Sequence, residues 1–345
     1  MSLKNPLENF NPNAPSTANS TLFGLPFDAS NAELILISVP WEVSVSYGAG
    51  TARAVYNMLE ASKQVDLFDI DSHQAWKKGI FLIPPDETIL SKSDFFRSLT
   101  EAHIQSIYED KTIDNERLAD INLAMDQTRE WVKATTSEWL AKGKKVALIG
   151  GDHSTPLGFM QALHDLEGEF GILQIDAHCD LRKAYEDIEF SHASIMYNAL
   201  ERIPGISKLV QVGIRDYCEE EYDYLLANAD RISCFFDNQI QKALFEGATW
   251  REITDKIIEQ LPRKVYISFD IDGLDPKLCP NTGTPVPGGF ELSQIDYLLH
   301  RILAAGKTII GFDLSEVGNG ESDWDANVGA RVLWKLCNRF LSNPV

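Results

Sequence analysis

The sequence of 345 residues contains no run of about 18 consecutive apolar residues, so no segment is expected to span a membrane. Its first residues lack a basic region followed by an apolar core, which argues against a secretory signal peptide. The five cysteines form no CxxC pair, and such an odd, unpatterned set fits a reducing compartment better than a disulfide framework. These absences together predict a cytoplasmic protein.

Basic residues are scarce. The 31 Lys and Arg residues face 51 Asp and Glu residues, which gives a formal net charge of −20. Nucleic acid is excluded as an expected partner, because its phosphates require a basic surface. An acidic surface instead steers cationic small molecules toward the protein. Halophilic or merely soluble proteins have the same balance, so the charge alone does not identify a ligand.

The chain does contain short β-branched or apolar runs that alternate with helical patterns. Helical spacing of apolar residues is clearest at 116–143, 219–229 and 291–306. Alternation of this kind is typical of a mainly parallel sheet with helices on both faces. We expect strands at ELILISV (33–39), QVDLFDI (64–70), KVALIG (145–150), FGILQID (170–176), KLVQVGI (208–214), RISCFF (231–236), KVYISFD (264–270) and KTIIGFD (307–313).

The domain organisation is expected to be simple. Residues 1–31 are rich in Asn, Pro and Ser and indicate an extended N-terminal arm, a candidate contact with a neighbouring subunit. Residues 32–345 are expected to form a single domain. Within it, the stretch 71–115 is irregular in pattern and is a candidate inserted flap.

One strand end carries three titratable side chains at alternate positions. In "ILQIDAHCDLR", Asp176, His178 and Asp180 follow an apolar run. Alternate residues of an extended chain point to one side, so these three side chains converge. Two carboxylates and an imidazole at close range cost free energy unless a cation neutralises them. The pattern therefore predicts a metal site.

Further polar side chains follow other expected strands. An Asp after a strand is often a helix N-cap, and a lone His is often structural; repetition at several strand ends favours the metal site instead. The carboxyl ends of parallel strands face one crevice, which would collect these residues. They are Asp152 and His153, Asp270 and Asp272, and Asp313 and Glu316. Asp275 before Pro276 is interpreted as turn chemistry and is left out.

The number and type of candidate ligands favour two ions over one. Six ligands are too many for a usual zinc site with an open position. Mixed carboxylate and imidazole ligation suits a hard divalent ion such as Mn²⁺. Four carboxylates would balance two divalent ions and leave a bridging hydroxide to meet a cationic substrate, which predicts a hydrolase. The six are His153, Asp176, His178, Asp180, Asp270 and Asp272.

Five motifs in order resemble the ureohydrolase family of arginases, agmatinases, formimidoylglutamases and guanidino-acid hydrolases. The motifs are GGDHS, DAHCDLR, SHAS, SFDIDGLDP and GFDLSEVG, and the resemblance extends from about Ala32 to the C-terminus. It implies a three-layer α/β/α sandwich with an eight-stranded, mainly parallel sheet. It also implies a di-manganese centre, with two Mn²⁺ per subunit, and a homo-oligomer, either a trimer or a hexamer.

The resemblance also assigns roles. It implies that Asp176 and Asp270 bridge the two ions. His153 and Asp180 complete one ion's ligands; His178 and Asp272 complete those of the other. His192 matches the family's proton-shuttling histidine and Glu316 the acid that grips the guanidinium, so the expected catalytic residues are Asp180, His192 and Glu316.

The substrate is the least determined feature. "NTGTPVPGG" (281–289) looks like the agmatinase form of that loop, and Arg182 stands where arginases have Asn. Hydrolysis of agmatine to putrescine and urea is therefore expected. Arg182 could instead hold a substrate carboxylate, and Trp324 could narrow the pocket, stack on a cation or be an ordinary core residue. Guanidinobutyrate, formimidoylglutamate and guanidine remain alternatives, the last with nickel.

Two hypotheses lie outside this class. A deacetylase of related fold would use a single zinc ion, but the six candidate ligands and Glu316 argue against it. A catalytically inactive binding protein would be expected to have lost ligands, and the sequence has lost none.

Overall fold

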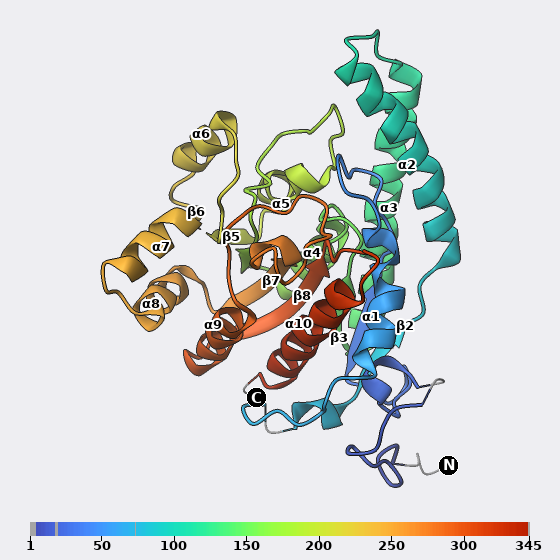
Figure 1. Ribbon diagram of the computed structural model, residues 1–345, viewed down its shortest axis with the longest axis vertical. Helices are drawn as coiled ribbons and strands as arrows, with labels where there is room; N and C mark the ends of the chain where they lie inside the picture. Colours follow the sequence, from blue (N-terminus) through green and yellow to red (C-terminus); the bar gives the residue numbers. More distant parts are fainter. Residues whose placement is uncertain (1–4, 18–19, 73, 344–345) are drawn as a thin grey trace.

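The computed structural model describes residues 5–17, 20–72 and 74–343 (Figure 1). Within these residues, one sheet of eight strands has the order β2-β1-β3-β8-β7-β4-β5-β6, and every neighbouring pair is parallel. The strands are β1 (Leu34–Ser38), β2 (Ile80–Ile83), β3 (Lys145–Ile149), β4 (Phe170–Ile175), β5 (Ile206–Val212), β6 (Ile232–Phe235), β7 (Lys264–Asp270) and β8 (Thr308–Ser315).

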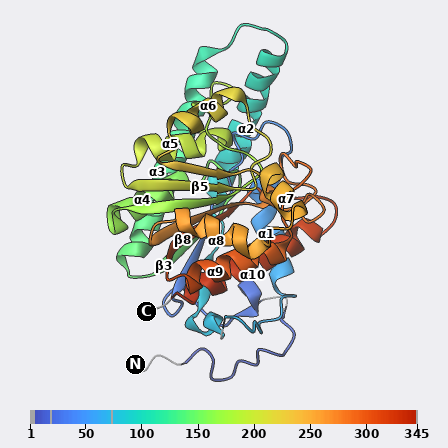
Figure 2. The same ribbon diagram turned by 90° about the vertical axis from the view of Figure 1, so that its left-hand side faces the viewer.

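Helices cover both faces of the sheet, as Figure 2 shows. Helices α1, α8, α9 and α10 form one layer; α3, α4 and α5 form the other. This arrangement confirms the three-layer α/β/α sandwich. The helices are α1 (Ala54–Ser62), α2 (Glu87–Tyr108), α3 (Asn115–Ala141), α4 (Leu157–Glu167), α5 (Ile195–Arg202), α6 (Glu219–Ala227), α7 (Asp237–Phe245), α8 (Trp250–Gln260), α9 (Leu292–Ala304) and α10 (Trp324–Leu341). None of those drawn from the described residues is both long and apolar enough to cross a membrane.

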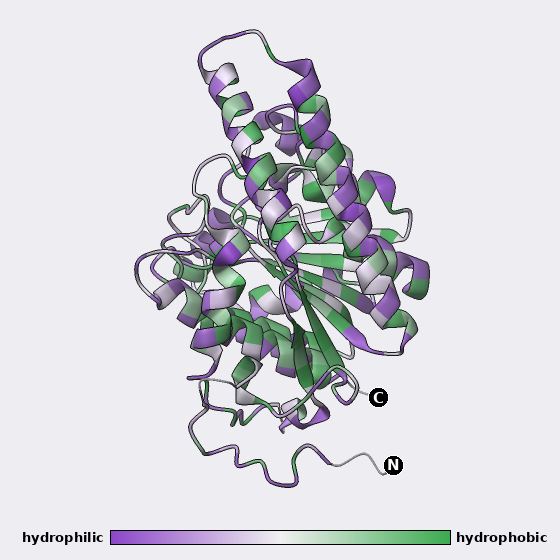
Figure 3. Cartoon of the chain, turned by 90° about the vertical axis from the view of Figure 1, so that its right-hand side faces the viewer, coloured by the Kyte–Doolittle hydropathy of each residue, from purple (hydrophilic) through white to green (hydrophobic). Residues whose placement is uncertain are grey.

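Local sequence explains these elements. All five residues of β1 and all six of β4 are buried, because helices cover both faces of the parallel sheet. Figure 3 accordingly shows hydrophobic strands at the centre of the molecule. Helix α9 begins with a capping box between Glu291 and Gln294, and its buried residues Ile295, Leu298, Leu299 and Ile302 lie along one face.

Seven of the eight expected strands are present, but the prediction for residues 64–70 is wrong. A strand inside the sheet would bury its apolar residues, yet Phe68 and Ile70 are exposed. Asp69 is buried instead, where it accepts hydrogen bonds from the amides of Asp71 and Ser72 and pairs with Lys335. This local turn ends the extended chain. The eighth strand is β2, a short run at the sheet edge.

The stretch 71–115 is not irregular, which corrects the expectation for it. It contains β2 and α2, and α2 begins where the Asp86 side chain accepts hydrogen bonds from the amides of Thr88 and Ile89. Helices α2 and α3 form a hairpin that projects beyond the sandwich (Figures 1 and 3). Because several buried residues of α2 are polar, its hydrophobic pattern does not mark it as a helix.

The N-terminal segment joins the core before the first strand. A 3₁₀ helix, η1 (Leu22–Gly24), buries Phe23 against Trp334, with the ring centroids 4.7 Å apart at an interplanar angle of 64°. Leu25 and Phe27 are buried as well. The last third of the expected arm therefore packs on its own chain. The contact of the N-terminal arm with a neighbouring subunit stays a prediction.

Candidate metal centre

The candidate ligands lie at the carboxyl ends of four neighbouring strands in the middle of the sheet, β3, β8, β7 and β4. His153 follows β3, Asp176 directly follows β4, Asp270 ends β7 and Glu316 directly follows β8. Since parallel strands end at the same edge, four segments far apart in sequence meet in one crevice. The expected convergence is therefore present in the fold.

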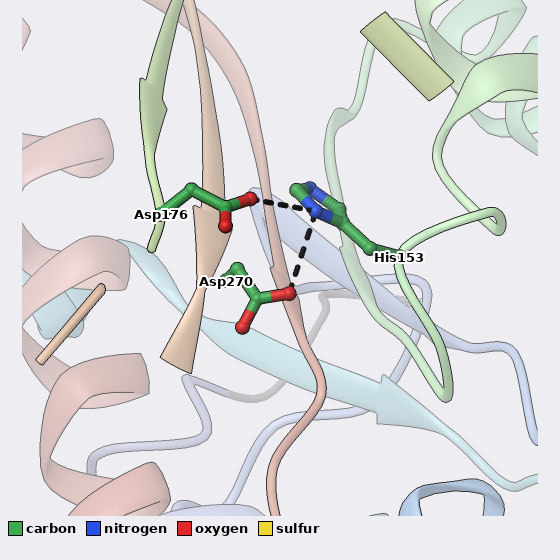
Figure 4. A group of neighbouring side chains, drawn as sticks. All are labelled: His153, Asp176 and Asp270. Carbon is green, nitrogen blue, oxygen red and sulfur yellow. Dashed lines mark ion pairs between the residues drawn. The ribbon is translucent and has the colours of Figure 1, made fainter. Parts of the chain in front are cut away.

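A first group surrounds His153 (Figure 4). Its Nδ1 lies 3.1 Å from Asp176 Oδ2, 3.0 Å from Asp180 Oδ2 and 3.4 Å from Asp270 Oδ2. Its Nε2 lies 2.8 Å from the hydroxyl of Ser268, which fixes the ring's orientation. The ligand atoms of His153, Asp176 and Asp270 all lie within 4.8 Å of one another, so one cation could contact all three, and Asp180 lies beside this group.

A second group surrounds His178. Its Nδ1 lies 2.9 Å from Asp272 Oδ2 and 3.7 Å from Asp176 Oδ1. Asp176 thus directs one oxygen toward each histidine. Two adjacent groups that share a carboxylate fit a binuclear metal centre.

Hydrogen bonds from the surrounding chain orient these carboxylates. The side chain of Gln174 donates to Asp176 Oδ2 at 2.9 Å, and the amide of Ala177 donates to Asp272 Oδ1 at 3.0 Å. The Asp272 amide donates to Asp270 Oδ1 at 2.9 Å. In Asp270 and Asp272 the bond leaves the other carboxylate oxygen to face a histidine. In Asp176 the oxygen that accepts from Gln174 is also the one that faces His153. Hydrogen bonds of this kind fix the orientation of metal ligands.

The electrostatics of the site favour a cation. Burial, together with the charges of Asp272 and Asp176, raises the pKa of Asp270 well above its usual value. Burial and the charge of Asp176 raise the pKa of Asp180 to about 7. Although burial opposes protonation of His153, hydrogen bonds to Asp176 and Asp180 raise its pKa well above the ordinary value. Without a cation, bound protons must relieve the repulsion between the buried carboxylates. Divalent ions would replace these protons, so the carboxylate and histidine donors fit the expected metals.

His192 begins the 3₁₀ helix η4 (His192–Ser194) beside the metal groups. Its amide donates to the Ser44 hydroxyl at 2.9 Å, and its Nδ1 lies 3.2 Å from the hydroxyl of Ser191. Burial, followed by the charges of His178 and His153, lowers the pKa of His192 to about 4. The ring is therefore neutral at pH 7 and can accept a proton before it donates one.

Glu316 has a positive φ of 60°, an unusual backbone conformation for a residue other than glycine. Its Oε1 accepts a hydrogen bond of 2.9 Å from the amide of His153, while its buried Oε2 has no hydrogen-bond partner. A buried carboxylate oxygen without a partner is costly, so a ligand donor is expected there. A Cβ on Gly283 would lie 3.3 Å from this oxygen, so the space beside it is narrow.

Two acidic residues from the strand ends do not join the metal groups. Asp152 accepts hydrogen bonds from the hydroxyls of Ser44 and Ser154, and Asp313 accepts one of 2.6 Å from Tyr266. They hold the loops and the sheet together around the centre. The structure brings the six expected ligands into one cluster; their role as ligands stays a prediction.

A cavity of about 510 Å³ opens over the second group. Its walls combine three of the expected site residues with aromatic and acidic side chains. Glu316 does not line it, but Gly283, beside Glu316 Oε2, precedes the lining residue Thr284. The lining residues are Ser46, Tyr47, His178, Asp180, Arg182, Tyr185, His192, Ala193, Asp216, Tyr217, Glu221, Thr284, Pro285 and Val286.

Arg182 lines the cavity and is also part of an ion pair. Its Nε lies 3.7 Å from the buried carboxylate of Glu221, and its guanidinium lies 4.9 Å from the ring centroid of Tyr185. Trp324 is 46% exposed, donates to the carbonyl of Lys277 and is not among the lining residues. It neither narrows the cavity nor belongs to the core.

No sequence motif marks Tyr185 and Glu221 as pocket residues. Glu221 had one local signal, because it lies three residues after Cys218 and forms a capping box at the start of α6. Tyr185 lies in a loop without periodic pattern. Both residues reach the cavity through tertiary contacts that the local sequence does not indicate.

A parallel sheet that carries paired histidine and carboxylate groups at its carboxyl edge defines the class of metal-dependent α/β hydrolases. Within that class, the chain belongs to the arginase family, whose family model matches residues 32–340. The sequence is 31% identical over 293 residues to N(1)-aminopropylagmatine ureohydrolase of Thermus thermophilus, covering 84% of each chain. It is 29% identical over 224 residues to agmatinase of Bacillus subtilis, covering 63% of this chain and 70% of the relative.

Solved structures show the same fold. Proclavaminate amidino hydrolase from Streptomyces clavuligerus has a TM-score of 0.72 at 19% identity, covering 96% of this chain and 100% of the other. Formimidoylglutamase from Bacillus subtilis has a TM-score of 0.68 at 19% identity, covering 92% and 90%. The resemblance read from the five motifs is confirmed, and the protein is a hydrolase acting on C–N bonds in linear amidines.

Proposed function

We propose that this protein hydrolyses agmatine to putrescine and urea with two Mn²⁺ ions held by the His153 and His178 groups. The observation that carries the proposal is Glu316, whose buried Oε2 has no partner beside the first group. A guanidinium would supply the missing donors to that carboxylate. Divalent ions bound in the two groups would lower the pKa of water and so supply a nucleophile near neutral pH.

The residues of this chain would bind and orient the substrate. Glu316 would hold the planar guanidinium and fix its carbon over the centre. The C–N bond breaks readily only if the nitrogen of the departing amine gains a proton. His192, neutral at rest, would take up a proton and deliver it to that nitrogen.

The pairing of Arg182 supports an amine tail over a carboxylate tail. Its partner Glu221 is buried and also accepts hydrogen bonds from the amides of Leu181 and Cys218. The positive charge of Arg182 is therefore already balanced on one side and repels a substrate ammonium less than a free guanidinium would. Guanidinobutyrate and formimidoylglutamate become the weaker alternatives, and guanidine is the alternative without a tail.

N(1)-Aminopropylagmatine is a second candidate substrate. The Thermus relative named for it aligns over most of both chains, whereas the Bacillus agmatinase aligns over a shorter part. A cavity of about 510 Å³ is also large enough for a guanidino compound with an extended polyamine tail.

The metal proposal follows from the donor set. Four carboxylates and two imidazoles suit Mn²⁺, a hard ion that tolerates mixed oxygen and nitrogen ligation. Nickel is the second candidate because imidazole also suits it. Reconstitution of the metal-free protein with each ion, followed by elemental analysis and assay, would distinguish them.

Urea release from a panel of guanidino compounds tests the proposed function. The panel contains agmatine, N(1)-aminopropylagmatine, 4-guanidinobutyrate, arginine and guanidine, each with the manganese-loaded and the metal-free protein. The expected result is metal-dependent urea release, fastest with the first or second compound. Release from 4-guanidinobutyrate alone or from guanidine alone would overturn the agmatine proposal. No urea release from any compound would overturn it too and would leave two hypotheses: hydrolysis of formimidoylglutamate, which yields formamide and no urea, and an inactive binding protein.

A homo-oligomer is proposed with the same function. The described N-terminal residues before η1 would supply one contact between subunits. Light scattering is expected to give three or six times the chain mass of 38.6 kDa, and the mass of a single chain would contradict the proposal.

A further inference from the structure

Helix α2 buries polar side chains along much of its inner face. Ser93 and Thr100 are completely buried, His103 is 1% exposed, and Arg97 is largely buried. A surface helix usually buries an apolar stripe, and buried polar groups cost free energy unless they form hydrogen bonds. The partners of Ser93, Arg97 and His103 therefore indicate what this face of the helix does.

Two of them hold one wall of the substrate cavity. The hydroxyl of Ser93 accepts a hydrogen bond of 3.0 Å from the amide of Glu42, and the Arg97 guanidinium donates to the carbonyl of Val45. This segment follows β1 and continues into the cavity wall at residues 46–47. Helix α2 thus fixes the backbone immediately before those lining residues.

His103 holds a second part of the cavity wall. Its Nε2 lies 2.8 Å from the carbonyl oxygen of Glu186, and because a carbonyl only accepts, the ring nitrogen donates. The preceding residue, Tyr185, lines the cavity. The Tyr185 ring lies edge-on to His192, with centroids 5.9 Å apart, and beneath the guanidinium of Arg182.

Helix α3 holds the same loop from a second direction. The Asn122 side chain accepts a hydrogen bond of 2.8 Å from the amide of Glu189 and donates one of 3.2 Å to the carbonyl of Asp187. Glu186 and Asp187 have φ angles of 52° and 62°. Such a conformation costs free energy in a residue other than glycine. Strain of this kind persists only where surrounding contacts impose it.

We propose that the α2–α3 hairpin positions both walls of the substrate cavity, and that His103 is a positioning residue that places Tyr185 beside His192 and the substrate. The identity of the substrate in this inference rests on the proposed function. The positioning of the cavity walls by the hairpin does not. His103 touches neither the metal groups nor the cavity among the described contacts, so it acts through the loop. The hairpin is thereby a determinant of how tightly the guanidino substrate is held.

The test compares His103→Ala, His103→Gln and His300→Ala with the wild-type protein, all loaded with manganese. The amide nitrogen of Gln can replace the ring donor, and His300 is an exposed residue of α9 that serves as the matched control. Two quantities are measured: amide hydrogen exchange of the peptide covering residues 183–190, and kcat and KM for agmatine, or for whichever panel compound the wild type hydrolyses.

His103→Ala is expected to speed exchange in that peptide and to raise KM about tenfold, with kcat nearly unchanged, because one hydrogen bond to a strained loop is lost. Metal content should not change. His103→Gln should restore both quantities, and His300→Ala should alter neither. A fall in kcat alone, or failure of Gln to rescue, would indicate a merely structural histidine and overturn the proposal.

A second variant covers the case in which His103→Ala does not fold. Asn122→Asp keeps the acceptor for Glu189 but loses the donor to Asp187 on a partly exposed side chain. It should raise exchange and KM in the same direction. If the wild type hydrolyses no guanidino compound, the proposed function fails, but amide exchange still tests whether the hairpin positions the loop. Unchanged exchange in both variants would overturn that positioning, and faster exchange would support it.

Discussion

Glu316 Oε1 accepts a hydrogen bond of 2.9 Å from the backbone amide of His153. The two residues follow β8 and β3, which are neighbours in the sheet. The proposed substrate anchor is therefore fixed to the residue whose ring centres the first metal group. The distance between the guanidinium and the metals would then be set by two neighbouring strands of the sheet, which position a site more precisely than loops do.

Glu316→Gln tests this anchor. The amide oxygen can still accept from His153, so the backbone should stay in place, but the negative charge facing the guanidinium is lost. We expect kcat/KM for agmatine to fall at least about 100-fold, because one partner of a buried charge pair is removed. Metal content should stay at the wild-type level. Glu259→Gln, at an exposed position on α8, is the control; equal activity of Glu316→Gln and the wild type would exclude Glu316 as the anchor.

Asp176→Asn tests the shared ligand. Because Asp176 directs one oxygen toward each histidine, its substitution should weaken both metal groups at once. Elemental analysis is expected to fall from about two ions per chain to less than one. Manganese should also stop raising the melting temperature, since ligand that no longer binds the native state gives no stabilisation. Asp120→Asn, on an exposed turn of α3, should keep both properties; an Asp176→Asn protein with full metal content would contradict a bridging role.

The segments of the centre were predictable because each carries its polar residues just after a buried run. Asp176 and His178 lie beyond β4, which ends at Ile175, so the following loop places their side chains and strand pleating does not. Asp180 in that loop has a positive φ of 54°. The convergence of β3, β4, β7 and β8 then followed from the rule that parallel strands end at one edge. Both steps need only the pattern within each segment.

The pocket walls were not predictable, because their contacts are long-range. His103 meets Glu186 across 83 positions, and Arg97 meets Val45 across 52. The local sequence of α2 does not indicate that it contacts Glu186 and Val45. Because its inner face is polar, the hydrophobic pattern does not predict the helix either. The wrong prediction of a strand at residues 64–70 has a similar cause, because the pairing of Asp69 with Lys335 joins residues 266 positions apart.

His192→Ala tests the proton carrier. The folded-state pKa of about 4 is below that of free imidazole, so the ring stays neutral as pH falls from 8 through 6 and becomes charged only near its folded pKa. We expect turnover to fall about 10²–10⁴-fold with metal content unchanged. Because His192 does not titrate between about pH 6 and 8, the loss factor should be constant there. A pH-rate profile with a loss confined to one side of neutrality would show that another group carries the proton.

Arg182→Ala tests the substrate tail. If the pocket accepts an amine, removal of a cation from its wall should leave agmatine turnover unharmed or improved. Turnover of 4-guanidinobutyrate should not improve, since a carboxylate loses a partner. Arg251→Ala, on the exposed face of α8, controls for loss of an arginine elsewhere. Loss of agmatine turnover in Arg182→Ala, or a wild type that hydrolyses only 4-guanidinobutyrate, would reassign Arg182 as a carboxylate anchor.

Phe23→Ala tests whether the end of the N-terminal segment is part of the domain core. The Phe23 ring is buried against Trp334 of α10, and its amide donates to the hydroxyl of Ser62 at the end of α1. Truncation of a buried phenylalanine to alanine typically costs about 3–5 kcal/mol of unfolding free energy. Denaturant unfolding of the metal-loaded protein should show that loss, whereas Phe245→Ala, at an 85% exposed position, should change stability by about 0.5 kcal/mol or less. Equal stability of the two variants would mean that the segment is a separable arm, as its composition alone suggested.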